Sequence, residues 1–150
     1  MSSTASTRLR LELQADGEND STWGSKANAV FNLIEEATDG YLAKSVAGSS
    51  NVTLTSTNFV SDESRQRVLE FTGTLTGNID VIVPATEKFY IVFNNTAGAY
   101  ALTFKPASGT GLVLTQGSKY IVYTNGSTMF EVSSFDGSAS IGIGLILALG

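Results

Sequence analysis

"NIDVIVPATEKFYIVFNNTAGAYALTFKPA", residues 78–107, is the stretch that decides the fold predicted for this chain. It holds three short runs rich in β-branched and aromatic residues, and Pro, Asn and Gly residues typical of turns separate them. Within each run the apolar residues alternate with other residues: Ile79, Val81 and Val83, then Phe89, Ile91 and Phe93, then Leu102 and Phe104. An alternation with a period of two predicts strands, each with one inward face toward a core.

Similar runs lie on both sides of this stretch. "NVTLTST" and "RQRVLEFTGTL" precede it, and "TGLVLTQG", "KYIVYTNG" and "TMFEVSS" follow it. Short strands at this spacing predict an antiparallel β-sandwich or jelly-roll-like domain over residues 46–135. We expect tight hairpin turns at Gly77 and Gly126, because each glycine stands beside an asparagine and can adopt positive φ, and a hairpin loop in "ASGTG" at residues 107–111.

The first 45 residues have a different pattern. Residues 1–7 are a Ser/Thr-rich arm, and "RLRLELQ" then alternates Leu9, Leu11 and Leu13 with polar residues, which predicts a half-buried strand. A helix is predicted next, ending at Gly40, with candidate caps at Asp20, Ser21 and Ser25. Its apolar residues fall at helical spacing: Ala27, Val30, Phe31, Ile34 and Ala37. The chain is therefore predicted to be mainly β, with an N-terminal arm and one short α-helix before the sandwich.

Trp23, the only tryptophan, stands in the polar segment "GENDSTWG" before that helix. Because it lies outside the predicted strands, we expect it to be buried in the folded or assembled state, between the helix and the sandwich or against a partner. We interpret residues 1–45 as an attachment module. Its predicted partner-binding residues are Leu9, Leu11, Leu13, Trp23 and Phe31.

The last segment, residues 136–150, contains the apolar run "IGIGLILALG" from Ile141 to Gly150. This run is half the ~20 residues that a helix needs to span a bilayer, so no membrane insertion is expected. Glycines at 142 and 144 favour an extended strand over a helix. We expect an assembly segment that copies of the chain, or a neighbouring protein, enclose through Ile141, Ile143, Leu145 and Leu147.

The composition excludes much chemistry. The 150 residues include no Cys and no His, which removes Ser-His-Asp and Cys-His nucleophiles and every imidazole or thiolate metal site. The net charge of -5 argues against a nucleic-acid partner. The candidate carboxylates for acid–base chemistry, which we interpret as solvated surface charge, are Glu35, Glu36, Asp39, Asp62 and Glu63. We predict no catalytic residue, no metal site and no cofactor.

Four tyrosines leave an alternative open. Tyr90, Tyr100, Tyr120 and Tyr123 could stack on sugar rings, as in a carbohydrate-binding β-sandwich. They lie within or beside alternating strands, which favours a packing role. A row of exposed tyrosines, or a cleft with paired carboxylates, would favour the carbohydrate function.

The order of motifs resembles a family of tailed-bacteriophage virion proteins, labelled tail-fibre-like or fibre N-terminal proteins, from phages of aquatic bacteria. The resemblance covers residues 8–132, and its most specific parts are "GEN..TWG" and the series "TGTLTGNI...VP...K.Y.V.NNT.G". It implies a structural component of the particle, commonly a trimer, without catalytic residues.

Together these observations predict a non-enzymatic virion protein, assembled in the bacterial host cytoplasm. No long shaft follows the predicted sandwich, which favours a capsid decoration (cement) protein. Its expected partners are further copies of itself, as a homotrimer, and the major capsid protein or another virion protein. The alternatives are a short tail or head fibre involved in host attachment and the carbohydrate-binding module.

Overall fold

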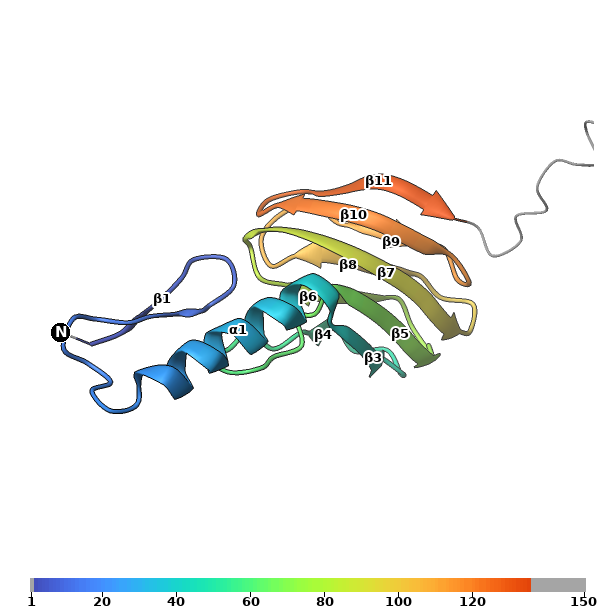
Figure 1. Cartoon of the computed structure of the whole chain (residues 1–150). Helices are drawn as coiled ribbons and strands as arrows, with labels where there is room; N and C mark the ends of the chain where they lie inside the picture. Colours follow the sequence, from blue (N-terminus) through green and yellow to red (C-terminus); the bar gives the residue numbers. More distant parts are fainter. Residues whose placement is uncertain (1, 136–150) are drawn as a thin grey trace, which may run out of the picture.

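The protein is mainly β, with one helix and an N-terminal arm beside two stacked sheets (Figure 1). A computed structural model describes residues 2–135. The elements are β1 (Thr4–Ala5), β2 (Glu12–Leu13), α1 (Trp23–Asp39), β3 (Tyr41–Ser45), β4 (Val52–Thr53), β5 (Val68–Thr74), β6 (Ile79–Val83), β7 (Glu87–Ala97), β8 (Leu102–Pro106), β9 (Leu112–Leu114), β10 (Lys119–Asn125) and β11 (Met129–Phe135). No helix in this part of the chain is both long and apolar enough to cross a membrane.

The core lies between a five-stranded sheet, in the order β11-β10-β7-β5-β3, and a four-stranded sheet, in the order β4-β6-β8-β9. Alternate residues of β6 and β8 face it, so Val81, Val83 and Phe104 are fully buried, as their alternation predicts. The Phe104 ring packs edge-on against Tyr90, with 5.4 Å between ring centroids, and lies 5.6 Å from the Phe71 ring. Strands from both sheets therefore supply one apolar layer.

The antiparallel arrangement predicted for the sandwich is wrong for about half of its strand pairs. From β3 to β8 the chain alternates between the two sheets. Each strand therefore pairs in parallel with the strand two places earlier in the chain: β5 with β3, β6 with β4, β7 with β5, and β8 with β6. Val68 pairs with Ile91 and Ile79 pairs with Leu102, the same offset in both sheets. Strands β3 to β8 thus wind around the core like a flattened coil, with one strand in each sheet per turn. Within the two stacked sheets, as far as the structure describes them, antiparallel pairing occurs only where β9, β10 and β11 complete the sheets.

The two predicted glycine turns have different outcomes. Gly126 has a φ of 92° and lies in the tight turn between β10 and β11, which confirms the hairpin there. The loop at residues 107–111 also joins an antiparallel pair, β8 and β9. Gly77 does not have positive φ, and it lies between β5 of one sheet and β6 of the other. The hairpin predicted at Gly77 is wrong, because the chain crosses between sheets instead of reversing within one.

Strand β7 presents the opposite face to the one predicted. Tyr90 and Val92 point into the core, whereas Ile91 is 36% exposed. Phe89 and Phe93 share the outward face with Ile91. The run "FYIVF" is apolar on both faces, so its alternation indicates a strand without indicating which face the second sheet covers.

Helix α1 begins at Trp23, so the tryptophan is its first residue and not part of the preceding turn. No side-chain cap closes its N-terminus, and the predicted caps are therefore wrong. Gly40 ends the helix as predicted, and its N–H donates to the carbonyl of Glu36 at 3.0 Å. Only Leu33 and Ala37 of α1 are buried. The N-terminal half of the helix therefore extends away from the sandwich (Figure 1).

The arm forms a small hairpin instead of a long strand. Only Glu12–Leu13 pairs, with Thr4–Ala5 of β1. Arg10 has a φ of 54°, a left-handed conformation that interrupts the extended backbone predicted through Leu9, Leu11 and Leu13. The tip of this hairpin, residues 6–10, meets the loop between β4 and β5, where the Phe59 N–H donates to the carbonyl of Arg10.

Candidate partner-binding surface

An apolar groove lies between the arm hairpin and the N-terminal half of α1. We call it the module groove, and it has a volume of about 380 Å3. Leu13 of β2 forms one wall, and the helix forms the other. Its apolar lining residues are Leu13, Trp23, Ala27, Val30 and Phe31. The helix residues fall at positions i, i+4, i+7 and i+8, which places them on one side of the helix.

The largest side chains of the module groove are open to solvent. The exposed fraction is 67% for Trp23, 62% for Phe31 and 54% for Leu13. A soluble monomer leaves single apolar side chains exposed, but an apolar cluster with an indented centre is typical of a surface that another molecule covers. The structure thus brings together three of the five partner-binding residues predicted in the N-terminal module.

Trp23 does not pack between α1 and the sandwich, and that part of the prediction is wrong. It starts the helix at the end remote from the sheets, so no part of the sandwich reaches it. Its burial by a partner stays a prediction. Leu9 and Leu11 are half-buried; Leu9 lies in the hairpin tip and Leu11 directly after it, and neither lines the groove.

Polar contacts fix one edge of the module groove. Lys26 of α1 forms an ion pair with Glu12 of β2, with 3.3 Å between Nζ and Oε2. Burial of the Glu12 carboxylate acts to raise its pKa, but hydrogen bonds from Ser3, Lys26 and Asn19 outweigh it, so the pKa lies below its ordinary value. The ion pair therefore links β2 to the helix at the edge of the groove.

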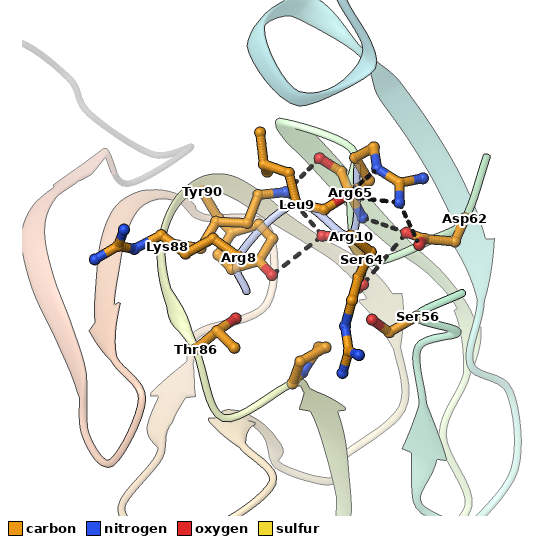
Figure 2. Close-up of a pocket in the computed structure, with 11 residues that line it drawn as sticks. Arg8, Leu9, Arg10, Ser56, Asp62, Ser64, Arg65, Thr86, Lys88 and Tyr90 are labelled. Atoms are coloured by element: carbon orange, nitrogen blue, oxygen red, sulfur yellow. Dashed lines mark hydrogen bonds and ion pairs between the residues drawn. The ribbon is translucent and has the colours of Figure 1, made fainter. Parts of the chain in front are cut away.

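A buried guanidinium joins the module to the sandwich (Figure 2). Arg65 lies in the loop between β4 and β5, and its Nε and Nη2 donate to the carbonyl of Leu9 at 3.1 and 2.9 Å. Its Nη2 also forms an ion pair with Asp62 at 3.1 Å, and its Nη1 lies 3.9 Å from Glu36 of α1. The Phe59 N–H donates to the carbonyl of Arg10 at 2.9 Å. Arm, helix and loop thus meet at one side chain.

Sequence reasoning missed this junction. Arg65 and Asp62 are both buried, with side chains only 1% exposed. A buried Arg–Asp pair three residues apart in a loop has no signature in local periodicity, because charged residues in loops are usually solvated. The surface charge predicted for Asp62 is wrong, since its carboxylate accepts from Arg65 and from the Thr57 N–H at 2.9 Å.

Lys88 of β7 also contacts the loop between β4 and β5. Lys88 Nζ donates to the carbonyls of Ser64 at 2.8 Å and Gln66 at 3.1 Å, and also to that of Arg65. The hydroxyl of Tyr90 donates to the Ser64 carbonyl at 3.1 Å. Burial lowers the pKa of Lys88 to about 7, against the opposing effect of the Asp62 charge. Burial also raises the pKa of Tyr90.

The junction has no room for a substrate. The cavity between Arg8, Arg65, Lys88 and Tyr90 measures about 10 Å3, about the space that one water molecule needs. Its polar groups already contact one another, so we interpret it as the anchor of the attachment module.

The other candidates for chemistry lie apart from the groove. Glu35, Glu36 and Asp39 border an open hollow at the C-terminal end of α1, and Glu63 pairs with Lys44. Within residues 2–135, no cluster of three or more Asp or Glu side chains is placed to hold a metal ion.

The four tyrosines do not form a stacking platform, and the packing interpretation holds for two of them. Tyr90 and Tyr120 are buried, whereas Tyr123 is half-buried and Tyr100 is 45% exposed. The predicted contact residues Ile141, Ile143, Leu145 and Leu147 lie outside the residues that the structure describes. Comparison of the chain with protein-family models, with curated proteins and with solved structures found no match.

Proposed function

We propose that this protein is a non-enzymatic structural component of a bacteriophage virion that attaches to the particle through its N-terminal module. The observation that carries the proposal is the module groove, where Leu13 of β2 is exposed beside Trp23 and Phe31 of a helix that extends away from the sandwich. The resemblance of residues 8–132 to phage virion proteins supplies the biological setting. In this proposal the protein is assembled in the bacterial host cytoplasm.

Attachment follows from the physical chemistry of the groove. Removing a large apolar side chain from water contributes roughly 1.5–3 kcal/mol, so three such residues can supply a binding energy of several kcal/mol. Tryptophan is enriched among the residues that dominate protein interfaces. The partner that suits the groove is an apolar helix or loop of the major capsid protein or of another virion protein.

The buried junction supports this function mechanically. Arg65 contacts the arm, the loop and the helix at once, so force on the module is transmitted to the sandwich through buried hydrogen bonds. The sandwich is then held at a constant distance and orientation from the particle. A homotrimer on the particle surface, decorating the capsid as a cement protein, is the arrangement that we propose.

The test of attachment is binding to purified particles that lack the protein. We expect Trp23→Ala to weaken binding about 30-fold or more, since a central interface residue costs at least about 2 kcal/mol on truncation. Phe31→Ala should act in the same direction. Neither variant should change the melting temperature greatly, because both side chains are exposed in the free protein.

Val113→Ala is the matched control. Val113 is 58% exposed on β9, remote from the groove, and its truncation should leave binding unchanged. Wild-type affinity in both groove variants would refute attachment through this surface.

Copy number separates capsid from tail. Quantitative mass spectrometry of purified virions should find hundreds of copies per particle if the protein decorates the capsid. A few to a few tens of copies would instead support a short tail or head fibre.

A further inference from the structure

The outer face of the five-stranded sheet is apolar across three strands. Neighbouring residues form two rows: Phe130, Tyr123 and Phe89 in the first, and Ile121 and Ile91 in the second. These five residues make up what we call the outer apolar face. Paired residues on one side of a sheet have Cβ atoms about 4.5–5.5 Å apart, so the rows form one continuous surface.

This face is incompletely covered within residues 2–135. Phe130 on the edge strand β11 is 46% exposed, and Ile91 on the middle strand β7 is 36% exposed. The opposite face of this sheet is buried against the second sheet. Strands that are apolar on both sides, as "FYIVF" and "YIVY" are, are typical of sheets covered on both faces. The pattern therefore indicates that a further segment covers the outer apolar face.

The chain continues from the edge of this same sheet. Strand β11 is its edge strand, and its last residue, Phe135, pairs with Lys119 of β10. Five residues, 136–140, then precede the apolar run. Extended, they span about 17 Å, whereas β7 lies two strand spacings or about 10 Å from β11. Ile141 can therefore reach the rows of the outer apolar face.

The chemistry of the two surfaces matches. Residues 141–150 have no charged side chain and include six Ile or Leu residues, and none of the five residues of the outer apolar face is charged. Charged residues border this face on two sides: the Arg67 guanidinium lies 4.8 Å from the centre of the Phe89 ring, and in the next row Lys119 and Glu70 flank Phe93. Lys119 Nζ lies 4.2 Å from the centre of the Phe93 ring, so this row forms a polar border to the apolar surface.

We propose that residues 141–150 pack on the outer apolar face of their own chain and complete the sandwich as a third layer. This inference goes beyond the proposed function, which depends on the module groove. The covalent tether favours the chain's own segment over that of another copy, because a short linker holds it at an effective concentration in the millimolar range. The free segment would otherwise expose its apolar side chains to water.

Cysteine cross-linking tests the proposal. Because the sequence has no natural cysteine, only the two introduced cysteines can react. The 150-residue chain carrying Ile91→Cys and Leu145→Cys is treated with a short bismaleimide at low protein concentration. We expect the major product to be an intramolecular cross-link, identified by its monomer mass and by the linked peptides. The control chain carries Val113→Cys with Leu145→Cys, and it should cross-link far less, because Val113 lies on the other sheet.

Three outcomes would overturn the proposal. The first is that cross-linked dimers are the major product, which would place another copy's segment on the face. The second is an equal yield of cross-link from the test and control pairs, and the third is no cross-link at all. As a second measurement, deletion of residues 141–150 should increase the fluorescence of a dye that binds apolar surface, and unchanged fluorescence would also count against it. Adding Trp23→Ala should leave the cross-link yield unchanged, which separates this test from that of the proposed function.

Discussion

Arg65 is the single residue on which contact between the arm and the sandwich most depends. Its guanidinium is buried, yet it has acceptors in two segments: Leu9 in the arm, and Thr57 and Asp62 in the loop between β4 and β5. A buried charge is tolerated only when it is paired and hydrogen-bonded, and each of these partners contributes to that compensation. Loss of the guanidinium would leave the Asp62 carboxylate buried beside an apolar neighbour.

We therefore predict that Arg65→Met lowers the free energy of unfolding by about 3–5 kcal/mol, the usual cost of breaking a buried ion pair. Urea denaturation followed by circular dichroism measures it. The control is Lys105→Met, whose partner Asp80 is 3.9 Å away and partly exposed, and which should cost less than about 1 kcal/mol. A similar small loss for both variants would show that the junction does not anchor the arm.

Lys88 gives the junction a dependence on pH. Burial lowers its pKa in the folded protein to about 7, whereas the ordinary value of 10.5 applies in the unfolded chain. Between these values the unfolded chain binds more protons than the folded protein, so the free energy of unfolding rises with pH. The contribution of Lys88 to the free energy of unfolding is therefore largest above pH 10.5, and it is lost as the pH falls toward 7.

We predict that the rise in stability between pH 7 and pH 9.5 is smaller in Lys88→Met than in the wild type. Urea denaturation at a series of pH values measures both slopes, and the difference between them isolates Lys88 from other titrating groups. Identical slopes would contradict the assignment of a lowered pKa to this lysine.

Among the structural elements, α1 is held at one end and free at the other. Gly40, where the helix ends, is enclosed: a Cβ built there would lie 2.1 Å from Gln66 Oε1 and 2.4 Å from the Glu36 carbonyl oxygen. Gly24, in the first turn, has no atom within 4 Å of such a Cβ. The same substitution should therefore have opposite effects at the two ends.

We predict that Gly40→Ala destabilises the protein by about 1–3 kcal/mol, because the enclosed site cannot accommodate a methyl group without movement of the backbone. Gly24→Ala should be neutral or stabilising by up to about 1 kcal/mol, because alanine favours the helix. Thermal unfolding of both variants measures the difference. Destabilisation by Gly24→Ala would show that the free end of α1 is closer packed than the structure shows.

The strands illustrate why element positions were easier to predict than their pairing. Each strand from β4 to β11 overlaps a segment predicted from its apolar residues, because alternation and turn residues act locally. The parallel pairing of β5 with β7 depends on where the chain goes between them, through β6 of the other sheet. No local pattern carries that information.

At the scale of the whole molecule, one apolar layer between the two sheets determines stability. Phe104 lies at its centre, fully buried between the rings of Phe71 and Tyr90. A domain of this size is stable by only about 5–15 kcal/mol, so one large cavity removes a substantial fraction of its stability.

We predict that Phe104→Ala lowers the free energy of unfolding by about 3–5 kcal/mol through lost burial and the cavity that remains. Val113→Ala, on the exposed side of β9, should change it by no more than about 0.5 kcal/mol. Both values come from denaturant unfolding. An equal effect of the two substitutions would show that the layer between the sheets is not the main core.

The sequence by itself determined where the strands from β4 to β11 form, where α1 ends at Gly40, and that Ile79, Val81 and Val83 face inward, since each depends on neighbours close along the chain. Residues 41–45, predicted as part of the N-terminal module, form β3 of the five-stranded sheet. Only the tertiary structure decided the parallel coil, the outward face of Phe89 and Ile91, the exposure of Trp23 and the buried pair of Arg65 and Asp62. In "FYIVF" both faces are apolar, so the sheet that happens to stack on β7 selects the inner one. Likewise, a charged loop residue becomes buried only when distant segments, here the arm and α1, fold over it.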